Sequence, residues 1–183
     1  MAQTLGDALT DLSRPRINRS PSPLLALAMP WLVIALGSLS PYWPLVASAP
    51  VVPPLGFMAL IAWQQARPGL LPVWAGLPLG LFDDLFSGQP MGSALLLWSL
   101  AMIALDTIEL RTPWRNFLST WAVAVAMIAA YLVLTLLIAT HGAGRTLPTV
   151  LIPQLVLSLL LYPLVARLVA AADRLRLVQL RQI

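Results

Sequence analysis

The sequence predicts an all-α, polytopic integral membrane protein with six transmembrane helices. Three observations support this fold class: the composition, a set of uncharged windows and the distribution of arginine. Of the 183 residues, 59% are hydrophobic and only 10% are charged, which is far more apolar than a soluble domain of this length needs to be. Cysteine is absent and there is one histidine, which excludes disulfides, thiolate metal sites and multi-histidine metal sites. We therefore expect no metal and no cofactor.

Six uncharged windows provide the candidate spans, and most of them approach the roughly 20 residues that a spanning helix needs. They cover residues 24–40, 45–63, 69–82, 90–105, 117–140 and 147–166. The second window is the weakest, because three prolines between residues 50 and 54 crowd its start and leave about a dozen helix-forming positions before Gln64. A chain with five spans and a re-entrant segment is therefore the alternative.

The distribution of arginine fixes the orientation. All eleven basic residues are arginine, and with the N-terminus inside only Arg145 falls outside. The other ten, on the cytoplasmic side, are Arg14, Arg16, Arg19, Arg67, Arg111, Arg115, Arg167, Arg174, Arg176 and Arg181. This bias follows the positive-inside rule and predicts that both termini are cytoplasmic. The same bias accounts for the formal charge of +4, because the arginines serve to orient the protein in the membrane. We therefore expect no nucleic-acid partner.

Three segments are expected along the chain. Residues 1–23 form a polar cytoplasmic arm whose RPRINRSPSP sequence is typical of a disordered leader at lipid headgroups. Residues 24–170 form the six-helix transmembrane domain. Residues 171–183 form a basic amphipathic cytoplasmic tail, which we expect to contact membrane lipids, or alternatively a cytoplasmic partner.

Five residues at intervals of four are the most informative pattern in the chain, and we call them the Gly/Asp stripe. They lie in the segment GLPLGLFDDLFSGQPMG and are Gly76, Gly80, Asp84, Gly88 and Gly92. Residues four apart share one face of a helix, and small residues on that face let another membrane helix approach closely. Because a carboxyl in a membrane needs a partner, we expect the stripe to bind a partner helix. Packing within the chain, with Asp84 capping or bonding a neighbouring backbone, is the alternative.

The end of the third helix bears on how far this stripe extends. Ser87, Gly88 and Pro90 indicate that the helix ends near residue 87. In that case Gly88 and Gly92 belong to a turn and to the next helix. Pro78 lies inside the stripe and is expected to kink the third helix.

Two further sets of residues are possible additional contact sites. Asp83 precedes Asp84 directly, so on a helix the two carboxyls project about 100° apart and make a poor acid/base pair. Ala122, Ala126 and Ala130, which we call the alanine stripe, repeat the four-residue interval in the fifth window and form a second candidate for close helix packing.

Catalytic motifs are missing from the sequence. There is no GxxxxGK[ST] phosphate loop, no HExxH zinc motif and no GxSxG nucleophile turn. Polar residues in the windows are sparse and fit packing or interface positions better than catalysis. The sequence therefore predicts that the protein is not an enzyme.

Residues 67–97, RPGLLPVWAGLPLGLFDDLFSGQPMGSALLL, resemble the rod shape-determining protein MreD family of bacterial inner membranes. The family pattern is an Arg-Pro turn followed by a helix with G-x-x-x-D-x-x-x-G-x-x-x-G, which Gly80, Asp84, Gly88 and Gly92 match. Overall length, six spans and cytoplasmic ends extend the resemblance to most of the chain. The extra Asp83, the long N-terminal arm and the prolines of residues 41–54 depart from the family pattern.

The resemblance implies a non-enzymatic scaffold of the bacterial cell-elongation complex, located in the inner membrane. It implies binding to MreC, a single-span periplasmic protein, and through MreC to the MreB filament, RodA and the transpeptidase that build peptidoglycan. It also implies a fold similar to the substrate-binding subunits of vitamin (ECF-type) transporters.

Two other functions stay open. The first alternative is such a transporter subunit, with Asp83, Asp84 and Arg145 as ligand-binding groups, although the first window lacks the Ala-x-x-x-Ala motif that these subunits tend to have. A membrane-embedded hydrolase is the third class, and the single histidine and the spacing of the aspartates argue against it.

Overall fold

The computed structural model describes residues 23–42, 52–111, 116–142 and 151–176, and all the regular structure in these residues is helical. The elements are α2 (Pro23–Ser38), η1 (Ser40–Tyr42), α3 (Leu55–Ala66), η2 (Val73–Ala75), α4 (Gly76–Phe86), α5 (Ser93–Arg111), α6 (Phe117–Gly142) and α7 (Leu151–Arg176). The all-α prediction is therefore confirmed for the described residues. Most of the expected N-terminal arm and of the tail, and also Arg145, lie outside them.

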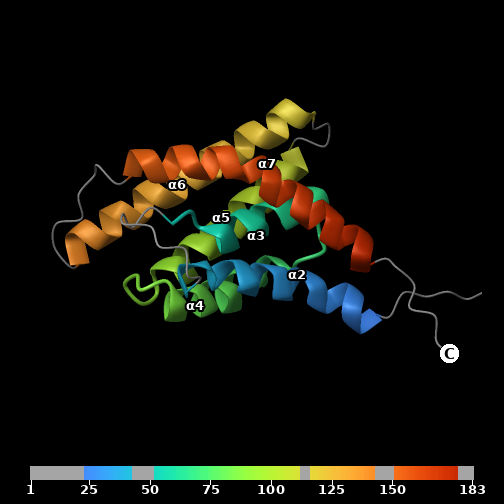
Figure 1. Cartoon of the computed structure of the whole chain (residues 1–183), viewed down its shortest axis with the longest axis horizontal. Helices are drawn as coiled ribbons and strands as arrows, with labels where there is room; N and C mark the ends of the chain where they lie inside the picture. Colours follow the sequence, from blue (N-terminus) through green and yellow to red (C-terminus); the bar gives the residue numbers. More distant parts are fainter. Residues whose placement is uncertain (1–22, 43–51, 112–115, 143–150, 177–183) are drawn as a thin grey trace, which may run out of the picture.

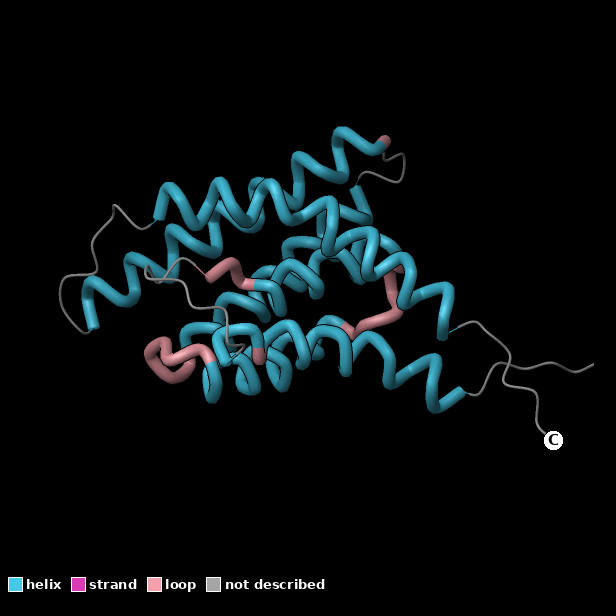
Figure 2. The backbone as a smooth tube through the Cα atoms, viewed as in Figure 1, coloured by secondary structure: helices cyan, strands magenta, loops and turns pink. Residues whose placement is uncertain are grey.

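The α-helices of the described residues run alternately between two ends of the molecule, so α2 begins and α7 ends at the same end (Figure 1). The tube in Figure 2 shows two described connections that reverse the chain, one between α3 and α4 and the other, at the opposite end, between α4 and α5. Each predicted window overlaps one helix. Three helices, α5, α6 and α7, are long and apolar enough to cross a membrane, whereas α2, α3 and α4 have 16, 12 and 11 residues. Crossing by all six helices stays a prediction.

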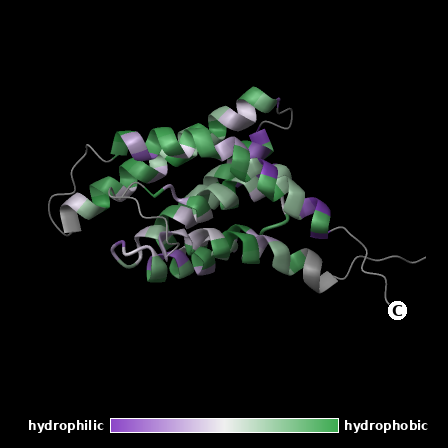
Figure 3. Cartoon of the chain, in the orientation of Figure 1, coloured by the Kyte–Doolittle hydropathy of each residue, from purple (hydrophilic) through white to green (hydrophobic). Residues whose placement is uncertain are grey.

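Large apolar side chains cover the outside of the molecule as well as its core. Leu100 on α5, Leu134 on α6 and Leu160 on α7 are all exposed, and Figure 3 shows mainly hydrophobic colours along the helices. A soluble protein of this size would not expose large apolar side chains along most of its helices, whereas lipid is a suitable solvent for them. The exposed surface of the described helices is therefore the kind found in membrane proteins, in agreement with the composition.

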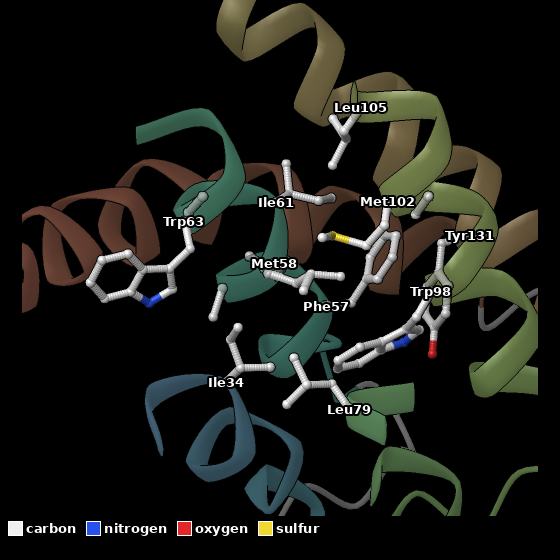
Figure 4. Packing of buried hydrophobic residues seen from close by; sticks show 14 of the residues in the cluster. Ile34, Phe57, Met58, Ile61, Trp63, Leu79, Trp98, Met102, Leu105 and Tyr131 are labelled. Atoms are coloured by element: carbon white, nitrogen blue, oxygen red, sulfur yellow. The ribbon is translucent and has the colours of Figure 1, made fainter. Parts of the chain in front are cut away.

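Helix α3 lies at the centre of the bundle and is covered by protein on all sides. Every residue from Gly56 to Gln64 is buried, and Phe57, Met58 and Trp63 belong to the main core cluster (Figure 4). A helix that is apolar all round is expected in such a position. The second window was the weakest because it is short. Neighbouring helices rather than lipid surround α3, so a short helix here does not expose polar backbone to lipid at its sides.

The polar end of α3 is bonded to the helices around it. Gln65 donates a hydrogen bond from Nε2 to the carbonyl oxygen of Thr120 on α6 at 3.0 Å, and it accepts one at Oε1 from the hydroxyl of Tyr162 on α7 at 2.7 Å. Gln65 is part-buried, and an amide withdrawn from water is costly unless it is bonded. These two bonds therefore hold the end of α3 between α6 and α7.

The position of Pro78 differs from the expectation. Helix α4 begins at Gly76, so Pro78 lies in the first turn, where a backbone N–H has no partner within the helix in any case. Pro78 therefore interrupts no α-helical hydrogen bond, and the kink expected there is not required. Pro163, by contrast, lies inside α7.

Reporter fusions test the direction of the chain at its turns. Fusions after Arg67 and Arg115 are expected to report the cytoplasm, and fusions at Gln89 and Gly142 the outer side, because arginine is retained inside. Paired cytoplasmic and periplasmic reporters give opposite signals at each site and control for expression. An outer-side signal after Arg67 would contradict six crossings and favour the re-entrant alternative.

Candidate functional site

The first part of the Gly/Asp stripe packs α4 directly on the backbone of α5. A Cβ atom added at Gly76 would lie 2.8 Å from the carbonyl oxygen of Trp98, and one added at Gly80 would lie 2.7 Å from both the carbonyl oxygen of Ala94 and the Cα of Leu95. Real Cβ atoms do not approach backbone atoms this closely. Only glycine therefore allows α4 and α5 to lie at this distance, as small residues do in other membrane helix pairs.

Asp84 caps the beginning of α5. Its Oδ2 accepts hydrogen bonds from the backbone N–H of Gly92 at 2.9 Å and of Leu95 at 3.0 Å, and its Oδ1 accepts one from the N–H of Ala94 at 2.9 Å. The hydroxyl of Ser93 lies 3.4 Å from Oδ1. These N–H groups have no partner within α5, and a carboxylate is also favourable beside the positive end of the helix dipole. The buried charge of Asp84 is thus compensated within the chain.

The last two residues of the stripe form the loop between α4 and α5. Gly88 has φ +68° and Gly92 has φ +93°, a left-handed backbone conformation that only glycine adopts freely. A Cβ at either position would meet no atom within 4 Å. These glycines are therefore required by backbone conformation rather than by close packing, and they lie outside the packed helix face.

The five residues of the Gly/Asp stripe thus build one αα-hairpin. Gly76 and Gly80 bring the two helices together, Asp84 caps the second helix, and the two loop glycines reverse the chain. The face occupied by the first three residues is filled by α5 of the same chain. This is the packing within the chain that the sequence left as the alternative, and binding of a partner helix by the stripe stays a prediction.

Asp83 is separated from this cap. Its side chain is 7% exposed, and its neighbouring hydroxyl is that of Ser38 at the end of α2. The two aspartates therefore contact different helices, as expected from their adjacent positions, and they do not flank a common point. Within the described residues no group of three or more histidine, cysteine, aspartate or glutamate side chains could hold a metal ion.

The alanine stripe lies on the outside of α6. Ala122, Ala126 and Ala130 are all exposed, whereas the opposite face of the helix buries Ala124 and Ile128 in the core. The stripe therefore takes no part in packing within the described chain. It leaves a surface of small side chains between residues 122 and 130 of a 26-residue helix, and this surface faces away from the bundle.

Two structural features have no counterpart in the sequence patterns. Gly37 on α2 and Gly56 on α3 meet, because a Cβ on Gly37 would lie 2.9 Å from the Cα of Gly56. Neither glycine belongs to a four-residue repeat, so periodicity could not identify them. The second feature is an ion-pair cluster in which Asp173 contacts Arg176, three residues further along α7, and Arg67, which lies 106 residues earlier in the sequence.

A comparison with family models identifies one match. The model described as rod shape-determining protein MreD matches residues 23–171, which begins at the first residue of α2 and ends within α7. Neither the curated proteins nor the solved structures contain a significant match to the chain. The expected similarity to vitamin transporter subunits therefore stays a prediction.

Proposed function

Because the chain belongs to the MreD family of rod shape-determining proteins, we propose that it is a non-enzymatic membrane scaffold of the cell-elongation complex. The family assignment itself implies a role in rod shape determination. The finer proposal is that the protein binds an MreC-type single-span partner in the bacterial inner membrane, with both of its own termini in the cytoplasm. Through that partner it would act on the MreB filament, RodA and the transpeptidase of peptidoglycan synthesis.

The observation that carries the proposal, beside the family, is the exposed alanine stripe on α6. Helix association in a bilayer gains little from apolar burial, because lipid is as apolar as leucine, and depends instead on close packing over small residues. The Gly/Asp stripe provides such a surface but uses it for α5. The alanine stripe provides a second one and leaves it uncovered within the described residues.

The length of α6 also suits a single-span partner. The helix has 26 residues and a mean hydropathy of 2.6 over its candidate span, so it offers a contact line as long as the bilayer core of about 30 Å. Helix α4 has only 11 residues, and its small residues Gly76 and Gly80 pack against α5, so its exposed face consists of larger side chains such as Leu81. We therefore assign the partner helix to α6 and lipid contact to the outer face of α4.

Cysteine cross-linking tests this assignment, and the chain suits it because it contains no cysteine. An Ala126→Cys variant, expressed with a partner carrying one cysteine in its span, is expected to form a disulfide-linked heterodimer in isolated membranes. The reason is that two side chains at a close helix contact come within disulfide distance. Leu81→Cys on the exposed face of α4 is the matched control and is expected to give little product.

Binding without cysteine chemistry is measured with Ala126→Leu. The larger side chain would push a partner helix away. Because Ala126 is exposed, the substitution should leave the abundance and melting temperature of the protein unchanged. Co-purification of the partner is expected to fall. Strong cross-linking through Leu81→Cys with none through Ala126→Cys would place the partner on α4 and refute the assignment to α6.

A further inference from the structure

The ion-pair cluster at the end of α3 holds one arginine at the surface in a fixed orientation. Both Nε and Nη2 of Arg67 lie 3.0 Å from Oδ2 of Asp173, and Nε of Arg176 lies 2.7 Å from Oδ1. The guanidinium of Arg176 also lies 5.7 Å from the centre of the Trp63 ring. Each carboxylate oxygen of Asp173 is therefore bonded to one arginine. Asp173 fixes the orientation of the Arg67 side chain, and 50% of the surface of that side chain stays exposed.

Two more arginines lie on the outer face of α7 beside this cluster. Arg167 and Arg174 are both exposed, and because they are seven residues apart they share one face of the helix. Arg174 follows Asp173 directly, so it is adjacent to the carboxylate that holds Arg67. Arg67, Arg167 and Arg174 therefore all add positive charge to the end of the molecule formed by the α3–α4 turn and the last turns of α7, and we call these three residues the basic surface.

Apolar side chains border this basic surface. Leu164, Leu168 and Leu175 on α7 are exposed by 53%, 60% and 59%. A surface that offers guanidinium groups at its end and leucine along the helix matches a molecule with an anionic head and acyl chains. Guanidinium groups recognise phosphate through paired N–H donors, and an arginine whose orientation is already fixed loses less conformational freedom when it binds.

We propose that Arg67, Arg174 and Arg167 form a binding site for the phosphate of an anionic phospholipid, with the exposed leucines of α7 in contact with its acyl chains. The arginine distribution places this end of the molecule at the cytoplasmic leaflet, where anionic headgroups attract basic residues next to membrane helices. The site is independent of the alanine stripe on α6 and does not rest on the proposed function.

Native mass spectrometry of the full chain in detergent tests the site, with phosphatidylglycerol and phosphatidylcholine of the same acyl chains as probes. We expect the protein to retain phosphatidylglycerol preferentially. Arg174→Gln is expected to weaken this binding about fivefold and to leave phosphatidylcholine binding unchanged. This variant keeps the contacts of Asp173 with Arg67 and Arg176, so its melting temperature should equal that of the wild type.

Arg111→Gln is the matched control, because Arg111 is also an exposed arginine in the last turn of a long helix. We expect it to change phosphatidylglycerol binding much less than Arg174→Gln does. An equal loss in the two variants would overturn the site in favour of a diffuse basic surface. Displacement of the lipid by millimolar inorganic phosphate would overturn it too, since the site would then recognise free phosphate and not the lipid.

Discussion

Gly80→Leu is expected to remove most of the folded protein from the membrane. Even a single Cβ at this position would lie 2.7 Å from two backbone atoms of α5, and backbone cannot move aside as a flexible side chain can. Overpacked cores typically lose roughly 1 to 3 kcal/mol, and separation of two helices should exceed this range. The measurements are the steady-state abundance of the protein in membranes and its melting temperature in detergent.

Leu81→Phe is the matched control for Gly80→Leu. It enlarges the neighbouring residue of the same helix, but Leu81 is 46% exposed and its side chain can extend into lipid. We expect normal abundance and an unchanged melting temperature. If Gly80→Leu were as abundant and as stable as wild type, α4 and α5 could not be packed through Gly80.

Asp84→Asn is expected to destabilise the protein by about 3 kcal/mol or more. The carboxylate accepts three backbone N–H bonds through two oxygens, whereas an asparagine side chain has one acceptor oxygen and would turn an N–H donor towards other donors. Hydrogen bonds to a charged acceptor contribute about 1.5 to 3 kcal/mol, and each buried group left without a partner costs about 1 to 3 kcal/mol. Thermal melting and hydrogen exchange at the start of α5 measure the effect.

Asp83→Asn is the control for this substitution, because Asp83 is also buried but accepts none of the backbone N–H bonds that Asp84 accepts at the start of α5. We expect a smaller loss of stability than for Asp84→Asn. The opposite order would mean that Asp83, the additional aspartate, is the capping residue. Equal and negligible effects would mean that α5 needs no side-chain cap.

These variants separate stability from partner binding. Gly80→Leu and Asp84→Asn act on a hairpin inside the chain, so a loss of rod shape in cells should follow the loss of protein. Ala126→Leu acts on an exposed surface of α6, so a loss of rod shape should occur at normal abundance. If the Gly/Asp stripe itself bound the partner, Asp84→Asn would instead cause loss of rod shape at normal abundance.

The sequence by itself determined the features that depend on composition and on residues near one another in the chain. Uncharged windows predicted the positions of the helices, because each helix must cover its own backbone with apolar side chains in lipid. The end of the third helix near residue 87 and the turn at Gly88 followed from local turn chemistry, and α4 indeed ends at Phe86.

Tertiary structure decided which helix each face meets. Four-residue intervals show that Gly76 and Gly80 share a face, as do Ala122 and Ala126, but an interval carries no information about whether α5, a partner or lipid lies opposite. The structure places the first pair on α5 and leaves the second exposed. Likewise, Arg67 and Asp173 are separated by 106 residues and meet only because α3 packs beside α7 at the centre of the bundle. A contact of this range depends on the packing of whole helices and not on local sequence.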